Sequence, residues 1–97
     1  MKSDAVVSVK FYSKENGGRI TPVPAHQYQC VFLTSETKGY DCRFIMSEEK
    51  ILYPENTYEL EVKFMDSRTA LAAIKPLSGF RIWEGKVIGE GKLIKVL

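Results

Sequence analysis

The sequence predicts an all-β protein, folded as a closed barrel or as a sandwich. Several short stretches alternate apolar and polar residues with the period of two that is typical of half-buried strands. Turns containing glycine or proline separate these stretches, and no long segment has the period of an amphipathic helix. Short strands joined by turns, without an internal repeat, are typical of both architectures. A barrel has the advantage that it leaves no open sheet edge.

Length and composition predict one domain that spans residues 1–97. The chain has 97 residues, of which 44% are hydrophobic and 27% charged, as in an ordinary folded protein with one core. A net charge of +2 is too small to indicate a nucleic-acid partner by itself. The first four residues lack the apolar segment of a secretory signal, and no apolar run has the length of a membrane span. We therefore expect a cytoplasmic location and no contact with a membrane.

The alternation places the strands in order along the chain. The clearest strand covers residues 57–64, where Tyr58, Leu60, Val62 and Phe64 share one face. A loop with glycines and prolines follows the first strand, and the residues between the second and third strands have the length and glycine of a hairpin loop. The predicted strands are 5–12, 28–32, 40–46, 57–64, 80–83 and a last strand, 93–96, that Gly89 and Gly91 precede.

Two further features of the sequence are an apolar segment whose secondary structure is undecided and a pair of cysteines. Residues 68–77 contain the apolar run 70–74, which fits either a helical turn or a short buried strand. Cys30 and Cys42 do not have the spacing of a paired zinc motif, and a disulfide is not expected in a reducing cytosol. The simplest interpretation is two small buried hydrophobic residues, with no metal site.

A series of short motifs resembles the third, C-terminal domain of elongation factor Tu. They occur in the family's order and together cover residues 5–97. The matching pieces are the GGR-x-TP run at 17–22, Gln29, Phe32, Thr34, Gly39, Pro54, Asn56, the F-x-I-x-E-G run at 80–85 and the G-x-G run at 89–91. The resemblance implies a six-stranded antiparallel Greek-key β-barrel, which agrees with the strands predicted from the alternation.

The resemblance also implies a surface that binds tRNA. In the family, the matching loop, second strand and E-G turn contact the phosphates and riboses of the T-stem. An arginine suits a bidentate phosphate contact, and glutamine or glutamate suits ribose hydroxyls. Three positions depart from the family: Ile20 replaces a usual histidine, Gln27 lies near a usual arginine, and Lys38 replaces a usual threonine. The candidate RNA-binding residues are Arg19, Gln29, Lys38, Glu84, Gly85 and Lys86.

Nothing in the sequence indicates an enzyme or a cofactor. The phosphate-loop motif G-x-x-x-x-G-K-[ST] does not occur, so no nucleotide triphosphate is expected to bind. His26 has no neighbouring nucleophile in a recognisable catalytic context. The adjacent pair Glu48 and Glu49 is more typical of a solvated turn than of acid and base catalysis.

Each candidate binding residue also has a structural interpretation. Arg19 either contacts a phosphate or holds its own loop in place. Trp83 and Tyr40 either stack on bases or pack against neighbouring side chains. The late lysines Lys86 and Lys92, with Lys95, either guide RNA or protect a sheet edge from association.

Two hypotheses on function remain open from the sequence. In the first, the domain is a non-catalytic module that binds tRNA or another structured RNA in a translation-related role. In the second, it docks on a protein partner such as a GTPase or an exchange factor. Clustering of Arg19 with Lys38, Lys86 and Lys92 on one face favours RNA. An exposed apolar patch near Ile20, Val23 and Trp83 favours a protein.

Overall fold

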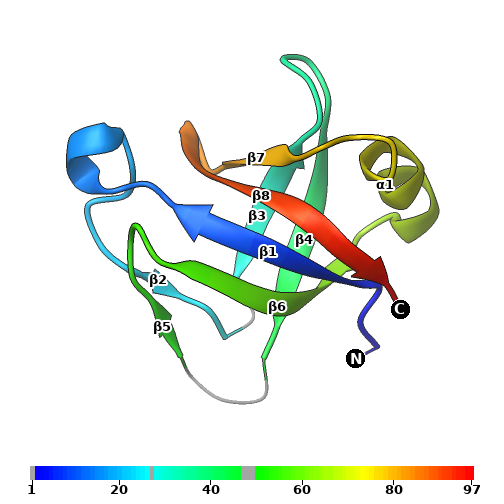
Figure 1. The fold of residues 1–97 in the computed structure, drawn as a ribbon, viewed down its shortest axis with the longest axis horizontal. Coiled ribbons are helices and arrows are strands. Elements are labelled where there is room, and N and C mark those ends of the chain that lie inside the picture. Colours follow the sequence, from blue (N-terminus) through cyan, green and yellow to red (C-terminus); the bar gives the residue numbers. More distant parts are fainter. Residues whose placement is uncertain (1, 27, 47–49) are drawn as a thin grey trace.

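Six antiparallel strands close into a barrel in the computed structural model, which describes residues 2–26, 28–46 and 50–97 (Figure 1). Around the barrel the strands follow the order β1-β6-β4-β3-β7-β8, and β8 pairs with β1 to complete the circle. The prediction of an all-β barrel is confirmed. The elements are β1 (Ala5–Phe11), the 3-10 helix η1 (Lys14–Asn16), β2 (Val23–Pro24), β3 (Gln29–Leu33), β4 (Gly39–Ile45), β5 (Ile51–Leu52), β6 (Thr57–Phe64), α1 (Ser67–Ile74), β7 (Phe80–Trp83) and β8 (Val87–Val96).

The connections follow the Greek-key pattern. Strands β3, β4 and β6 are antiparallel neighbours in that order, and β7 returns to pair with β3, which gives the spatial order β7-β3-β4-β6. The short strands β2 and β5 form a separate two-stranded sheet. In Figure 1 this small sheet lies at the lower left of the barrel.

The barrel interior contains the apolar face that the alternation predicted. On β6 the side chains of Leu60, Val62 and Phe64 are buried, whereas those of Glu59 and Glu61 are exposed. Aromatic rings from distant strands meet inside: Phe32 stacks on Phe80 with centroids 4.0 Å apart and contacts Phe64 edge to face at 5.9 Å. Such contacts join β3, β6 and β7 through the core.

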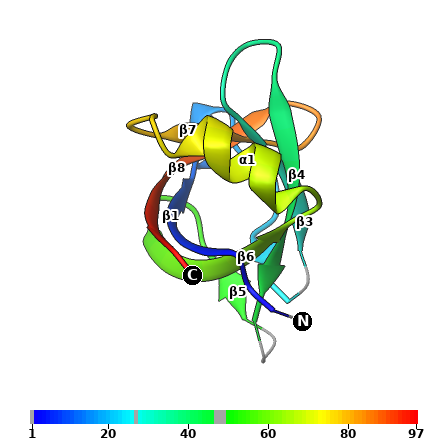
Figure 2. The same ribbon diagram turned by 90° about the vertical axis from the view of Figure 1, so that its right-hand side faces the viewer.

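The ambiguous segment after β6 is helical. Asp66 caps α1, because its Oδ1 accepts a hydrogen bond from the Thr69 backbone N–H at 3.3 Å and its Oδ2 accepts one from the Thr69 hydroxyl at 2.8 Å. Ala70 and Ile74, four residues apart and therefore on one face, are buried. Pro76 lies two residues after the end of α1, and a proline there cannot continue the helix. Figure 2 shows α1 lying across one end of the barrel.

The last strand is longer than the sequence predicted. Gly89 and Gly91 lie inside β8, which begins at Val87, and do not precede the strand. A Cβ atom at Gly91 would meet the Phe80 ring at 2.8 Å and the Ser8 carbonyl oxygen. The glycines therefore mark close backbone approach between β8 and its neighbours, and the prediction of a strand boundary there was wrong.

No helix in the described ranges combines the length and the apolar character needed to cross a bilayer.

Candidate binding groove

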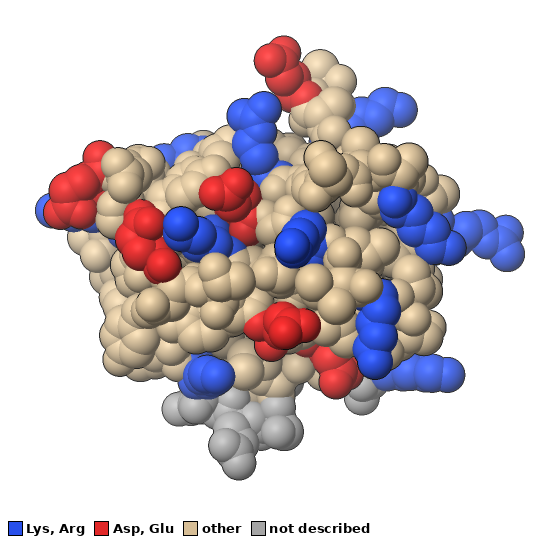
Figure 3. Space-filling view, viewed as in Figure 1, with Lys and Arg blue, Asp and Glu red and all other residues tan. Residues whose placement is uncertain are grey.

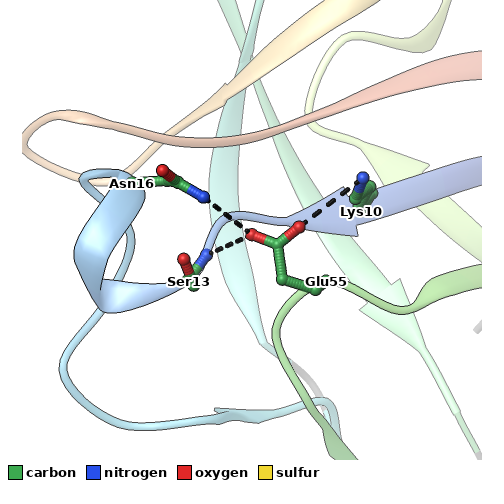
Figure 4. Close-up of polar contacts among 4 residues, drawn as sticks. All are labelled: Lys10, Ser13, Asn16 and Glu55. Carbon is green, nitrogen blue, oxygen red and sulfur yellow. Dashed lines mark hydrogen bonds and ion pairs between the residues drawn. The ribbon is translucent and has the colours of Figure 1, made fainter.

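The loop that carries Arg19 is anchored by Glu55 (Figure 4). Glu55 Oε1 accepts hydrogen bonds from the Ser13 backbone N–H at 2.9 Å and from Asn16 Nδ2 at 3.4 Å. Its Oε2 lies 3.6 Å from Lys10 Nζ. The backbone hydrogen bond from Ser13, with smaller contributions from Asn16 and Lys10, lowers the pKa of the Glu55 carboxyl group. The turn before β6 therefore holds the start of the Arg19 loop against β1.

The guanidinium group of Arg19 is engaged inside the protein. Its Nε lies 3.4 Å from Glu84 Oε2, its Cζ lies over the Tyr28 ring at 5.5 Å from the ring centroid, and Nη2 donates a hydrogen bond to Thr21 Oγ1 at 3.4 Å. The Tyr28 hydroxyl donates to the other oxygen of Glu84, Oε1, at 2.6 Å. Burial, followed by this hydrogen bond, raises the pKa of Tyr28.

We call these three residues the Arg19–Tyr28–Glu84 cluster. Only 23% of the Arg19 side chain is exposed, and the Glu84 carboxylate balances its charge. Arg19 therefore ties the loop to the turn between β7 and β8, through side-chain partners that the sequence did not predict.

Three of the six candidate residues line one groove of about 590 Å³ on the outside of the barrel. They are Gln29 at the start of β3, and Glu84 and Gly85 in the turn after β7. Gly85 has a φ of +78°, a backbone conformation that residues with a side chain rarely adopt, so this turn requires a glycine. Lys86 is the next residue of the same turn. We call this site the Trp83 groove. Its outward-facing residues lie on β3, β4, β6 and β7, except for one that directly follows β6. They are Gln29, Val31, Asp41, Arg43, Lys63, Met65 and Trp83.

Lys38 lies away from the other candidates. Gln29 pairs with Arg43 at one end of the β3–β4 ladder, and Leu33 pairs with Gly39 at the other. Four residues of strand separate these ends by about 13 Å. Lys38 belongs to the hairpin loop beyond, where its backbone N–H donates to Ser35 Oγ at 3.1 Å. The structure does not bring Lys38 to the groove.

One row of the groove floor is basic. Lys63 of β6 stands directly opposite Arg43 of β4, which stands opposite Gln29 of β3. With its amide oxygen facing Arg43, Gln29 accepts hydrogen bonds from Nε at 3.2 Å and from Nη2. Lys63 Nζ lies 3.7 Å from Asp4 Oδ1. Sequence analysis missed Arg43 and Lys63 because nothing in the sequence shows that β4 pairs with β6, although the alternation put both side chains on the outer face.

The second row is largely apolar. Val31 stands between Trp83 of β7 and Asp41 of β4, and the Met65 backbone N–H donates to the Asp41 carbonyl oxygen at 3.1 Å. Met65 is 82% exposed and Trp83 39% exposed. Trp83 is thus an accessible aromatic side chain on the outer face of β7, whereas Ile82, the residue before it, is buried.

The three apolar residues whose exposure would favour a protein partner differ in how exposed they are. Ile20 is 80% exposed and Trp83 is accessible, whereas Val23 is buried in the core. The exposed residues therefore include two of the three.

The two cysteines lie behind the floor of the groove. Cys30 and Cys42 are paired across β3 and β4, both are buried, and their sulfur atoms are 3.7 Å apart as free thiols. Burial raises the pKa of the Cys42 thiol. The prediction that both are small buried residues is confirmed.

A second hollow, of about 670 Å³, lies over β1, β7 and β8. Its charged residues are Lys10, Arg81, Glu90 and Lys92, and Glu90 stands opposite both Lys10 and Arg81 in the strand register. Figure 3 shows basic and acidic side chains interspersed on the face that carries β1 and β8. Lys92 therefore does not cluster with Arg19.

Within the described ranges, the residues considered for catalysis do not form a catalytic arrangement. His26 is exposed, and its Nδ1 lies 3.0 Å from the Met46 carbonyl oxygen, to which it donates when protonated. Gln27, Glu48 and Glu49 lie outside the described residues. The described residues also contain no group of three or more His, Cys, Asp or Glu side chains placed to hold a metal ion.

No family model matches the chain, and no curated protein sequence matches it. The resemblance to the third domain of elongation factor Tu therefore stays a prediction from the motifs themselves.

Proposed function

We propose that this protein is a non-catalytic binding module of the elongation factor Tu third-domain type, and that it binds a protein partner through the Trp83 groove. The observation that carries the proposal is the exposure of Trp83 and Met65 on a concave outer face of the barrel. Tryptophan, methionine and arginine are enriched at protein interfaces, and tryptophan is a common energetic anchor there. The proposal includes a cytoplasmic location and no bound nucleotide triphosphate.

The charges around the groove favour a protein over RNA. RNA affinity comes mainly from contacts between cations and phosphates. Here Arg19 is paired with Glu84 and Lys63 with Asp4, while Asp41 adds a further carboxylate to the floor. A surface with nearly balanced charge and exposed apolar groups suits a protein partner better than a polyanion.

RNA binding remains the second candidate, because Gln29, Glu84 and Gly85 share the groove with an accessible tryptophan. Bases stack on exposed aromatic side chains, and glutamine can bond ribose hydroxyls. In this alternative, Arg43 supplies the phosphate contact that the sequence assigned to Arg19.

A comparison of two alanine variants tests the proposal. Trp83 and Leu77 are almost equally exposed, at 39% and 38%, but Leu77 does not line the groove. We expect the wild type and Leu77→Ala to retain the same protein from a nuclease-treated extract, and Trp83→Ala to lose it. Mass spectrometry of the eluates and reconstitution with the purified partner measure the loss.

A titration of labelled tRNA at roughly 50 and 200 mM salt provides the opposing test. Binding at the lower salt that falls steeply at the higher salt, and that Arg43→Gln weakens, would establish RNA as the ligand. Equal retention of the protein partner by Trp83→Ala and Leu77→Ala would exclude the groove as the docking site.

A further inference from the structure

Two cations occupy directly opposite positions on the floor of the Trp83 groove. Arg43 of β4 and Lys63 of β6 are register partners, and like charges at such positions destabilise a sheet. Lys63 has Asp4 as a partial partner at 3.7 Å, and that carboxylate also accepts a hydrogen bond from the Phe64 backbone N–H at 2.8 Å. Within the part of the chain that the structure describes, the Arg43 guanidinium makes no ion pair and turns to the neutral Gln29 amide. This arrangement leaves a place for an external carboxylate.

The apolar row runs parallel to this basic row, two residues further along the strands. Trp83 and Val31 are register partners on β7 and β3, and Gln29 lies two residues before Val31. Two residues of strand span about 7 Å. The Arg43 and Lys63 pair lies on β4 and β6, whereas the Trp83 and Val31 pair lies on β7 and β3, so the two pairs are also offset by two strand spacings, about 10 Å. A ligand that contacts both pairs must therefore present an anionic group and an apolar group about 12 Å apart.

An extended peptide meets this requirement. Side chains on one face of an extended chain recur at every second residue, about 7 Å apart, so residues four positions apart share a face and lie about 13 Å from each other. We infer that the segment that occupies the Trp83 groove is an extended peptide in which an aspartate or glutamate lies four residues from a large apolar residue. The carboxylate contacts Arg43 and Lys63, and the apolar side chain lies between Trp83 and Val31. This inference rests on the proposed function and specifies the chemistry of the partner.

The remaining charges in the groove select a peptide carboxylate over a run of phosphates. Asp41 stands beside Val31 in the apolar row, and the Glu84 carboxylate lies at the rim. A single carboxylate can sit on the Arg43 and Lys63 side of the groove, whereas successive phosphates would also pass these two acidic groups. Opposite charges across an interface set the register of the partner, and like charges reject the wrong one.

Selection from a phage library of random twelve-residue peptides tests the inference. The targets are the wild type, Trp83→Ala, the double variant Arg43→Gln/Lys63→Gln, and a control, Lys92→Gln/Lys95→Gln, that removes two exposed cations from β8. We expect the wild type and the control to enrich peptides with an acidic residue four positions from an aromatic or aliphatic one. The Arg43→Gln/Lys63→Gln variant keeps the apolar preference without the acidic one, and Trp83→Ala enriches no peptide.

A synthetic peptide with the enriched sequence gives the quantitative test by fluorescence anisotropy. Replacing its acidic residue by the matching amide should weaken binding to the wild type about fivefold, and should leave binding to Arg43→Gln/Lys63→Gln unchanged. Circular dichroism melts establish that every variant is folded before its binding is compared, and Trp83→Phe replaces Trp83→Ala if the latter is not.

The outcomes separate the inference from the proposed function. Enrichment of apolar peptides without an acidic residue, or equal acidic enrichment by the double variant, would overturn the inference and leave groove docking in place. Failure of the folded wild type to enrich any peptide above the Trp83→Ala background would overturn both. Binding of tRNA that Arg43→Gln abolishes would replace the peptide with RNA.

Discussion

The hydroxyl group of Tyr28 donates a 2.6 Å hydrogen bond to Glu84, across 56 residues of sequence. This bond joins the residue that precedes β3 to the turn that follows β7, and Arg19 closes the cluster from a third segment. One rim of the Trp83 groove is therefore fixed by side chains from three separate loops.

Replacing Tyr28 by phenylalanine should lower the free energy of unfolding by about 1 kcal/mol at neutral pH. The ring still packs against Phe44, whose centroid lies 5.3 Å away, so the loss isolates the hydroxyl. Urea denaturation at pH 7 measures the difference. Unchanged stability would show that the hydrogen bond contributes nothing net.

The same variant should respond less to alkaline pH. The pKa of Tyr28 is raised in the folded protein, by burial first and by Glu84 second. Its contribution to stability is therefore fully present below the unfolded pKa of about 10 and is lost as the pH rises above it. Urea midpoints from pH 8 to 11 should fall more steeply for the wild type than for Tyr28→Phe. Parallel curves would contradict this assignment.

Glu55→Gln should lower the melting temperature at pH 7, with the effect disappearing in acid. The pKa of Glu55 is lowered in the folded state, chiefly by the Ser13 hydrogen bond, so its contribution is present above the unfolded pKa of about 4.3. That contribution is lost as the pH falls through the lower folded pKa, where the wild-type carboxyl is neutral like the amide. Thermal melts between pH 2.5 and 7 measure the convergence. A constant difference across this range would rule out the charge as its source.

Gly91→Ala should destabilise the barrel by about 2 kcal/mol or more, because the new Cβ meets the Phe80 ring and the Ser8 carbonyl oxygen inside a closed sheet. Gly85→Ala is the matched control. Its Cβ would have no neighbour within 4 Å, so the cost is the positive φ alone, about 1 kcal/mol. Chemical denaturation of both variants gives the two values. A larger loss for Gly85→Ala would mean that β1 and β8 can move apart.

The thiols of Cys30 and Cys42 should react slowly with a chromogenic disulfide reagent in the folded protein and rapidly in denaturant. Both side chains are buried, and burial raises the pKa of Cys42, which keeps the reactive thiolate scarce. Absorbance against time, with and without guanidinium, measures the ratio. Rapid reaction of two thiols without denaturant would show that strands β3 and β4 open readily.

The sequence predicted the barrel well wherever one face of a strand is buried. Leu60, Val62 and Phe64 show why: an alternation of period two states directly which side chains point inward. It could not decide the segment 67–74, because the helix depends on the Asp66 cap and on burial of Ala70 and Ile74 against the barrel end. It misplaced the start of β8, because the need for Gly91 comes from Phe80 and Ser8, which are distant in sequence.

The candidate site was predicted only in part, for the same reason. The motifs named Gln29 and Glu84 as candidates, and the structure places both in one groove, but the motifs could not show that Glu84 is already paired with Arg19. The juxtaposition of Arg43 and Lys63 depends on the register between β4 and β6, which no local pattern specifies.

Strand β1 closes the barrel by pairing with both β6 and β8, and Ala5 stands opposite Val96. Because β1 leaves the ribosome before β8, its second edge stays uncovered until β8 has been synthesised. Contacts between residues so far apart slow folding, and an uncovered edge invites pairing with another chain. Ribosome-bound chains that end before β8 should consequently depend on chaperones, whereas a circular permutant that joins β8 directly to β1 should fold faster than the natural order.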